Sequence, residues 1–596
     1  MVTDGWLVCQ GLRAHEHGRR ERCNLRGVLV HARKLALAVT CASVALVGAP
    51  AVASAAGDPF AGYENQQLTW GACPFPTEPG AKDAQCAMVT VPRDWAAPTG
   101  GVDMQVSISR VKASGASLGP ILINPGGPGG QGTGLAGILA ALEPTVGARY
   151  DFIGMDPRGT GHEGDTTAAG APIACQVPTG RLPQDPLDAR DRSAKSIAEH
   201  QQIPRAVAEA CQSVAESPFL TTWQTAHDME LIRQLLGAPK LNYLGYSYGS
   251  WLGAKYASLF PGSAGKIVLD SSVNWQGRLE ADFEDFPVID QRQFDQVYVP
   301  WLTRTQPDVF GATPDAVRQK WEQVRAYYKS QGVSGDRYDD VWVGMGSKFA
   351  WLQATQIFQA GIKALGGATP ASSELQRQLD AQAQTTFGKP AAAVTAQDVK
   401  AVIPPDYVAV EDVRYAVACG DQPTRSAAWY KGLSDRQGPK YPLFGWQYGI
   451  SETCGFWSDA PRQTLPTLPA SVAKNVLVVQ GEFDPQTGYE QAHAAVKAAP
   501  GVSLISVDDS PYHGQYALTA NPCVDGMVNV FLLDNSRPGS NTCPGVPLIG
   551  ETEVFPVPGP VKSPAAQSFG SFAQVSGPAA LREHAQEFIR RTNALR

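Results

Sequence analysis

The chain has 596 residues, and its 49 basic and 56 acidic side chains give a formal net charge of −7. Hydrophobic residues make up 43% of it and charged residues 18%, which excludes a disordered or collagen-like chain, because enough apolar surface is present to build a core. The length by itself suggests roughly three or four domains. No basic face is evident, so nucleic acid is not expected as a partner.

The first 56 residues differ in charge from the rest. They hold seven basic and three acidic side chains, a net charge of +4, so the remainder carries −11. Arg33 and Lys34 precede an apolar run, Leu35–Val47, which is followed by the small residues of Ala51–Ala56. This pattern is typical of a secretory signal peptide, and we predict a leader at 1–56 and a secreted mature chain. A membrane anchor is the alternative, although the apolar run is shorter than the ~18 residues of a membrane span.

Eight cysteines remain once the leader is removed, and an even number in an exported chain favours disulfides. Pairing neighbours along the chain closes loops of modest length, which loop-closure entropy favours slightly. The predicted pairs are Cys73–Cys86, Cys175–Cys211, Cys419–Cys454 and Cys523–Cys543. Free buried thiols are the alternative for any one pair. No CxxC motif or histidine cluster accompanies the cysteines, so we expect neither a metal site nor a cofactor.

From Gly119 onwards, short apolar segments alternate with helical patterns. The expected strands are Ile121–Ile123, Phe152–Met155, Leu241–Leu244, Lys266–Leu269, Asn475–Gln480 and Val502–Val507. The expected helices include Ala226–Leu236 and Ser250–Phe260. Buried strands that alternate with helices predict an α/β fold whose sheet is mostly parallel and covered by helices on both faces.

The alternation of strand and helix patterns stops between residues 273 and 430. This segment contains long amphipathic stretches, such as Pro314–Lys329 and Ser347–Ala364, and few strand patterns. We interpret it as a helical insertion into one catalytic domain. The predicted organisation is a first catalytic part at 57–272, a mainly helical cap at 273–430, and a second catalytic part at 431–596 that ends in a helix, Ala579–Leu595.

A candidate nucleophile stands in Gly245–Gly249, which reads G-x-S-x-G around Ser247. The glycines allow the crowded strand-to-helix turn that exposes such a serine. Ser117 lies in a second match, but it precedes a strand and no helix follows it, so it is interpreted as a turn serine. Ser247 follows an expected strand and opens an expected helix. An ordinary turn is the alternative for Ser247 as well.

A serine hydroxyl needs a base to become a nucleophile, and the base needs an acid to orient it. For a nucleophile on this kind of turn, the acid and then the base follow along the chain. His513 lies in a loop after the strand Val502–Val507 and is the predicted base. Asp484 lies just after Asn475–Gln480 and is the predicted acid. Glu482 and Asp270, which ends an earlier strand, are the alternative acids.

Acyl transfer also needs hydrogen-bond donors for the oxyanion. The loop Asn124–Gly130 reads NPGGPGG, and its glycines let backbone N–H groups approach a substrate closely. We predict Gly127 as one donor and Tyr248, which follows the nucleophile, as the other. A turn with no ligand is the alternative. A phosphate-binding loop is disfavoured, because neither GK[ST] nor GxGxxG is present here.

Four motifs occur in an order that resembles one family: Asn124–Gly130, Asp156–Gly161 (DPRGTG), Gly245–Gly249 and Gly481–Asp484. On these motifs the mature chain is similar to the secreted tripeptidyl aminopeptidases of the α/β-hydrolase fold, which are relatives of prolyl aminopeptidases. The resemblance implies an exopeptidase that removes tripeptides from a free N-terminus beneath a helical cap. It also implies the nucleophile Ser247, the acid Asp484, the base His513 and the oxyanion donor Gly127.

An aminopeptidase must hold the substrate ammonium, and a carboxylate of the cap would do so through a charge-assisted hydrogen bond. The acidic residues at the start of the insertion are Glu280, Asp282, Glu284 and Asp285. We interpret them as a solvated helix face and assign no amine-binding residue.

Three functions remain open. The first is a serine aminopeptidase that acts on peptide or protein N-termini, with no membrane insertion after the leader is removed. The second is a carboxylesterase or other acyl hydrolase on the same fold, or an enzyme with prolyl aminopeptidase-like activity, because the triad does not choose the leaving group. The third is a non-catalytic binding protein. The complete set of Ser, Asp and His with a glycine loop argues against the third. The sequence does not indicate an oligomeric state.

Overall fold

The computed structural model describes residues 58–99, 102–165, 167, 170–368, 370–403, 412–534, 536–562 and 577–593. The predicted leader, residues 1–56, lies outside this part of the chain. Among the described residues, no helix combines the length and the apolar character that crossing a membrane requires.

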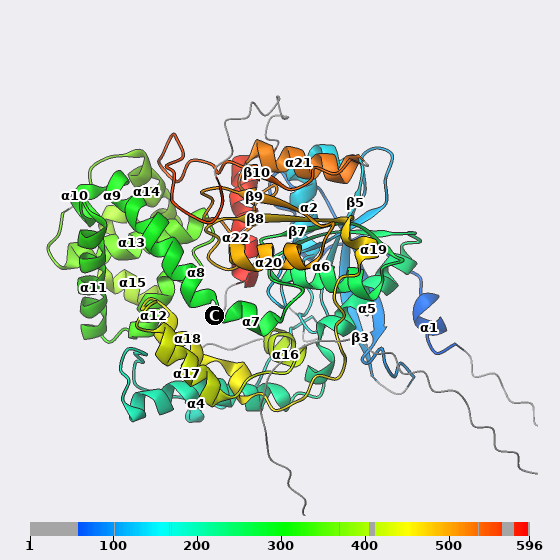
Figure 1. Ribbon diagram of the computed structural model, residues 1–596, viewed down its shortest axis with the longest axis horizontal. Helices are drawn as coiled ribbons and strands as arrows, with labels where there is room; N and C mark the ends of the chain where they lie inside the picture. The colour runs from blue at the N-terminus through cyan, green and yellow to red at the C-terminus, as the bar shows by residue number, and fades with distance from the viewer. Residues whose placement is uncertain are drawn as a thin grey trace, which may run out of the picture. The chain divides into compact units, whose positions relative to one another are not determined.

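A sheet of ten strands forms the centre of the described fold (Figure 1). In spatial order the strands are β1 (Gly71–Ala72), β2 (Gln85–Pro92), β3 (Asp103–Val111), β5 (Asp151–Asp156), β4 (Pro120–Asn124), β6 (Leu241–Tyr246), β7 (Ala264–Asp270), β8 (Val476–Gly481), β9 (Ser503–Val507) and β10 (Asn541–Cys543). The pairs from β1 to β5 are antiparallel. The pairs from β5 to β10 are parallel, so the carboxyl ends of β4, β6, β8 and β9 lie at one edge.

Each central strand contributes to two hydrophobic cores, one on each face of the sheet. In β4, Leu122 belongs to one core, and its neighbours Ile121 and Ile123 belong to the other. Side chains alternate across a strand, so a continuous apolar run fills both faces. Helices α5, α6 and α20 cover the first face, and α2, α21 and α22 cover the second (Figure 1). This is the doubly covered parallel sheet that the sequence predicts.

The helices fall into two groups by position. Those that precede, flank or follow the strands are α1 (Ala61–Glu64), α2 (Thr133–Leu142), α3 (Pro144–Gly147), α4 (Ala194–Gln212), α5 (Thr222–Leu235), α6 (Tyr248–Leu259), α19 (Ala470–Ala473), α20 (Tyr489–Ala498), α21 (Pro522–Leu533) and α22 (Ala579–Asn593). Those between β7 and α19 are α7 (Leu279–Phe283), α8 (Phe286–Gln293), α9 (Val299–Thr305), α10 (Pro307–Phe310), α11 (Pro314–Ser330), α12 (Gly335–Asp339), α13 (Lys348–Ala364), α14 (Glu374–Phe387), α15 (Ala396–Val402), α16 (Asp412–Gly420), α17 (Ala427–Gln437) and α18 (Gly445–Tyr448).

Helix α11 shows why the segment after β7 is helical. The hydroxyl of Thr313 accepts a hydrogen bond from the Ala316 N–H and caps the helix, and Pro314 occupies its first turn. Its buried side chains recur at helical spacing and include Val317, Trp321, Val324 and Tyr328. They join a separate core with residues of α9 and α13, which lie together to one side of the sheet (Figure 1). The boundaries 57–272, 273–430 and 431–596 stay predictions.

All six expected strands are present, each within two residues of the predicted limits. The strands β1 to β3 and the long helix α4 escaped the sequence analysis. Strand β2 alternates between buried and exposed positions, so it has no continuous apolar run. Helix α4 contains Pro204, which lowers the helical signal of a polar segment.

The eight cysteines of the described residues pair as expected. The structure contains Cys73–Cys86, Cys175–Cys211, Cys419–Cys454 and Cys523–Cys543. All of these bonds link residues within 36 positions of each other along the chain. Four disulfides are typical of a protein that folds in an oxidising compartment.

Candidate active site

Ser247 occupies the sharp turn between β6 and α6. Its φ of 58° lies in the left-handed region, which is unusual for a residue with a side chain. The flanking glycines are required by close packing, because a Cβ atom on Gly245 would lie 2.6 Å from the Gly249 carbonyl oxygen. A Cβ atom on Gly249 would lie 2.9 Å from Oδ1 of Asn124. The two glycines of the G-x-S-x-G pattern therefore allow the close packing around Ser247.

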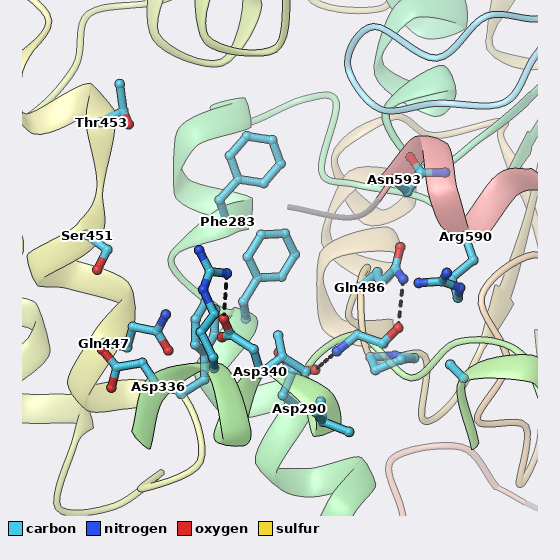
Figure 2. Close-up of a pocket in the computed structure, with 18 of the residues that line it drawn as sticks. Phe283, Asp290, Asp336, Asp340, Gln447, Ser451, Thr453, Gln486, Arg590 and Asn593 are labelled. Carbon is cyan, nitrogen blue, oxygen red and sulfur yellow. Dashed lines mark hydrogen bonds and ion pairs between the residues drawn. The ribbon is translucent and has the colours of Figure 1, made fainter. Parts of the chain in front are cut away.

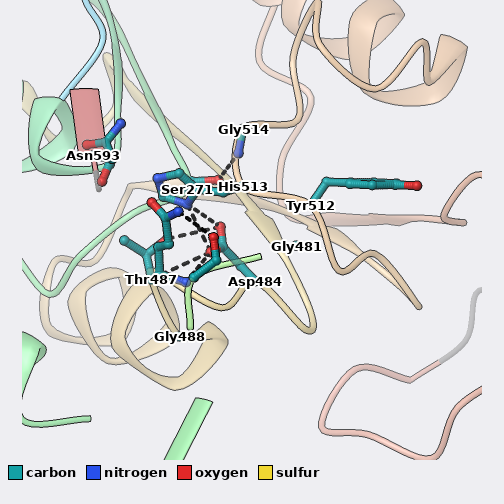
Figure 3. Close-up of polar contacts among 12 residues, drawn as sticks. Ser271, Gly481, Asp484, Thr487, Gly488, Tyr512, His513, Gly514 and Asn593 are labelled. Atoms are coloured by element: carbon teal, nitrogen blue, oxygen red, sulfur yellow. Dashed lines mark hydrogen bonds and ion pairs between the residues drawn. The ribbon is translucent and has the colours of Figure 1, made fainter. Parts of the chain in front are cut away.

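His513 and Asp484 meet across the ends of β9 and β8. Nδ1 of His513 lies 2.9 Å from Oδ1 and 3.0 Å from Oδ2 of Asp484 (Figure 3). The Asp484 carboxylate also accepts hydrogen bonds from the N–H groups of Gln486 and Thr487 and from the Thr487 hydroxyl. Nε2 of His513 is buried and has no hydrogen-bond partner among the described residues. The ring therefore donates from Nδ1 and presents Nε2 as a proton acceptor.

The two alternative acids face elsewhere. The carboxylate of Glu482 accepts hydrogen bonds from the N–H groups of Asp509 and Val561. The carboxylate of Asp270 accepts hydrogen bonds from the N–H groups of Gln515 and Tyr516, at 2.9 and 2.7 Å. Burial raises the pKa of Asp270 to about 7. Of the three predicted candidates, the structure brings only Asp484 into hydrogen-bond contact with the His513 ring.

Asp270 connects the serine turn to the histidine loop. Its backbone carbonyl accepts the Ser247 N–H at 3.0 Å, while its carboxylate holds the backbone just after His513. The next residue contributes as well, because the Ser271 hydroxyl accepts the Gly514 N–H at 2.6 Å (Figure 3). Strand β7 therefore fixes the two neighbouring loops relative to each other.

The helical segment after β7 reaches His513 directly. The His513 N–H donates to the Gly346 carbonyl oxygen at 2.8 Å. A Cβ atom on Gly346 would lie only 2.4 Å from Cβ of His513. The backbone of the insertion thus lies against the predicted base, and a glycine is needed at this contact.

The predicted oxyanion loop after β4 lies beside Ser247. Gly126 and Gly127 have φ values of 105° and 116°, and a Cβ atom on Gly126 would lie 2.9 Å from Cβ of Ser247. The Gly127 N–H donates to Oδ1 of Asn593, the last residue of α22. Asn593 was not predicted, because nothing in the spacing of a terminal amphipathic helix indicates which polar residue it carries to a distant loop.

A cavity of about 220 Å³ contains the candidate residues Gly127, Ser247 and Tyr248 in its wall. Further wall residues come from α22 and the loop after β8, and others from the insertion, including Asp290, Asp336 and Asp340 (Figure 2). Each of these aspartates has a polar partner. Oδ2 of Asp336 lies 2.7 Å from Nε2 of His200. Asp340 forms an ion pair with Arg337 at 3.0 Å, and the Asp290 carboxylate accepts the Gly344 N–H. Sequence reasoning missed these aspartates, because helix-borne acids give no signal of a shared cavity.

The interpretation of the acidic cluster as a solvated helix face is wrong for two of its members. Glu280 and Asp282 are only 2% and 5% exposed. Glu280 accepts hydrogen bonds from the Tyr430 hydroxyl and the Arg425 N–H, and burial raises the pKa of Asp282 well above its usual range. Neither residue is among those that line the cavity. The segment around Tyr430 covers Glu280, whereas the Asp282 carboxylate accepts the Asn274 N–H at 3.0 Å and its backbone carbonyl accepts from Gln491 of α20.

Comparison with known proteins also supports a serine hydrolase. A family model described as "TAP-like protein" matches residues 441–543, which include Asp484 and His513. The chain is 29% identical over 485 residues to the tripeptidyl aminopeptidase of Streptomyces lividans, covering 76% of this chain and 82% of that protein. It is 26% identical over 508 residues to serine protease Hip1 of Mycobacterium tuberculosis, covering 80% of this chain and 90% of that protein.

A further relative carries a different name. The chain is 27% identical over 529 residues to carboxylesterase B of Mycobacterium tuberculosis, covering 83% of this chain and 94% of that protein. The sheet order, the helices on both of its faces and these matches agree with one assignment. The chain is an enzyme, a serine hydrolase with the α/β-hydrolase fold, and its sequence is similar to those of tripeptidyl aminopeptidases.

Proposed function

We propose that the mature protein is a secreted serine exopeptidase that cleaves peptide bonds near a free N-terminus and releases tripeptides. The four disulfides support export to an oxidising compartment. The relatives named tripeptidyl aminopeptidase support the substrate class.

The hydrogen bonding of His513 carries the mechanistic part of the proposal. Asp484 holds Nδ1 at 2.9 Å, and Nε2 has no partner among the described residues. In the proposed reaction, Nε2 takes the proton from the Ser247 hydroxyl as the Ser247 oxygen attacks the scissile carbonyl carbon. The same nitrogen then protonates the leaving amine, which departs and leaves an acyl-enzyme. Water activated by His513 hydrolyses this ester and restores Ser247.

The backbone N–H groups of Tyr248 and Gly127 are the proposed donors for the oxyanion that forms at each addition step. Tyr248 begins α6, so its N–H is one of those that the helix itself leaves without a partner. Positioned donors that stabilise the developing charge typically contribute a factor of about 10²–10³ each to the rate.

Recognition of a free amine is supported by the carboxylates of the cavity. Asp290, Asp336 and Asp340 line the same cavity as Ser247. A carboxylate is the side chain that binds an ammonium group through charge-assisted hydrogen bonds. A substrate whose N-terminus enters this cavity would meet these acids.

Ester hydrolysis is the second candidate, and the relative named carboxylesterase B favours it. A serine, histidine and aspartate act on esters and amides by the same steps, so the site alone does not choose between them. Prolyl aminopeptidase-like activity stays a third possibility within the peptidase class.

One assay series separates these candidates. The mature protein and its Ser247→Ala variant are tested on unblocked tripeptide amides, single-residue amides, N-blocked amides and a short-chain ester. Cleavage of unblocked tripeptide amides alone, lost in the variant, supports the proposal. Turnover of single-residue proline amides would favour the prolyl activity. Ester turnover without amide cleavage would replace the proposal by the esterase function.

A further inference from the structure

The last turn of α22 ends beside the glycine loop that follows β4. Helix α22 is anchored by Leu581, Ala585 and Ile589, which are buried in the core on one face of the sheet. It packs against α2 and α13. Its final described residue, Asn593, is 6% exposed and lies in the wall of the cavity that also contains Ser247 (Figure 2). The terminal helix therefore delivers one amide side chain into the candidate active site.

The Asn593 amide binds the glycine loop through both of its polar atoms. Oδ1 accepts the Gly127 N–H at 2.5 Å, and Nδ2 donates to the Pro125 carbonyl oxygen at 2.8 Å. A Cβ atom on Gly126 would lie 2.3 Å from Oδ1 of Asn593 and 2.9 Å from Cβ of Ser247. The amide and the serine thus approach the same glycine.

The chemistry of this contact matches that of a substrate. A side-chain amide has the same carbonyl group as a peptide bond, and its oxygen here occupies the N–H that an oxyanion at Ser247 would require. One N–H donor makes one strong hydrogen bond, so Asn593 and a substrate oxygen cannot both use it fully.

We propose that Asn593 is an autoinhibitory contact: its amide occupies the Gly127 donor, and substrate must displace it before the oxyanion site is complete. The proposal rests on the proposed function, because it takes Gly127 as an oxyanion donor. Displacement breaks the bonds of Asn593 to Gly127 and Pro125 and the bond that Nδ2 also donates to the Ile589 carbonyl oxygen, one turn earlier in α22. The final turn of a helix has few intrahelical bonds to lose, so the anchored part of α22 can stay in place.

The rate of Ser247 labelling by a fluorophosphonate tests this contact without a peptide substrate, because the phosphonyl oxygen needs the same donors. Asn593→Ala should label about 5-fold faster than the natural chain, the factor that corresponds to one displaced hydrogen bond. A chain that ends at Thr592 should show the same increase. His584→Ala is the control on the same helix, since the His584 side chain pairs with Glu78 and does not line the cavity, and it should label at the natural rate.

The outcomes separate this proposal from the proposed function. Slower or equal labelling of both Asn593→Ala and the shortened chain, with thermal midpoints near that of the natural chain, would show that Asn593 supports the loop and would overturn the inference. Faster labelling without cleavage of any tripeptide amide would support the inference and reject the peptidase function. Absence of labelling in every variant would count against both.

Discussion

The two hydrogen-bonding nitrogens of one imidazole determine the chemistry proposed at Ser247. Asp484 accepts from Nδ1 of His513 and so fixes the tautomer that leaves Nε2 as the base. Asp484→Asn keeps the size of the side chain but can donate to Nδ1, which favours the opposite tautomer. We expect kcat on the best substrate to fall about 10⁴-fold with little change in KM. Steady-state kinetics on the purified variant measure both.

Glu482→Gln is the matched control for that substitution. Glu482 precedes Asp484 by two residues, but its carboxylate accepts backbone N–H groups of Asp509 and Val561 instead of contacting His513. Glutamine keeps only one of these two acceptor oxygens, so the substitution weakens one loop contact but removes no contact of His513. Its kcat should stay within a few-fold of the natural value. Equal losses in both variants would contradict the assignment of Asp484.

The contact between Gly346 and His513 gives a second prediction at the residue scale. A Cβ atom at Gly346 would lie 2.4 Å from Cβ of His513 and 3.1 Å from its backbone nitrogen, so Gly346→Ala must displace the histidine. A displacement of about 1 Å costs on the order of 100-fold in rate. We expect that loss in kcat/KM.

The control for Gly346→Ala is Gly432→Ala, whose Cβ would meet only the end of the Arg436 side chain at 3.3 Å. Gly432 lies in α17, where alanine favours the helix, so kcat/KM should not change. A fully active Gly346→Ala enzyme would show that the insertion does not position His513.

At the scale of elements, the bond between Cys523 and Cys543 ties the start of α21 to the edge strand β10. The loop that carries His513 lies between β9 and α21, so this bond restrains one of its two ends. The double variant Cys523→Ser, Cys543→Ser should lose about 3 kcal/mol of unfolding free energy, as expected for a closed loop of 20 residues. Urea unfolding followed by tryptophan fluorescence measures this loss.

The same experiment has an internal comparison. Cys73→Ser, Cys86→Ser removes the bond that joins Cys73, the residue after β1, to β2. This bond closes a loop of 13 residues that is remote from the His513 loop in the sheet order. It should also lower stability, but activity at 25 °C should stay at the natural value. A larger loss of activity in this variant than in Cys523→Ser, Cys543→Ser would contradict the inference that the Cys523–Cys543 bond restrains the loop that carries His513.

At the scale of the whole molecule, buried acids predict that stability falls as pH rises through neutrality. Burial raises the pKa of Glu143 and Asp270 to about 7, and that of Asp421 and Asp525 to about 6. The unfolded chain loses these protons near pH 4, so between pH 4 and 7 the folded state binds more protons, and the free energy of unfolding decreases with rising pH. The midpoint of thermal unfolding should be a few °C higher at pH 5.5 than at pH 8.0.

Calorimetry at one scan rate checks this difference, and Glu143→Gln provides the control. The Glu143 carboxylate accepts a hydrogen bond from Asn529, which a glutamine oxygen can also accept. The variant should therefore keep its midpoint at pH 5.5 and gain stability at pH 8.0. Ion pairs have the opposite effect on stability at lower pH. Arg325 and Lys329 lower the pKa of Asp188, so the stability that this carboxylate contributes is lost as the pH falls. A midpoint that is higher at pH 8.0 would contradict the prediction.

Local sequence patterns predicted many of the elements of this protein before the structure was considered. The six apolar strands, the glycine spacing around Ser247 and the order of Asp484 and His513 follow from rules that act over a few residues. The four disulfide pairs could be predicted for the same reason, because each joins cysteines that are neighbours along the chain. Strands β1 to β3 were not, since half-exposed strands at the side of a sheet have no continuous apolar run.

Contacts between distant segments required the tertiary structure. Only the packing of the sheet ends shows that Asp484, and not Glu482 or Asp270, meets the His513 ring. Only the placement of α22 shows that Asn593 binds Gly127, a residue 466 positions away. Short-range sequence patterns carry information about φ, ψ and burial, whereas hydrogen bonds between remote residues depend on how the helices pack on the sheet. The sequence alone thus predicts the type of chemistry, and the tertiary structure decides that Asp484 is the acid that meets the His513 ring and that the Asn593 amide accepts the Gly127 N–H.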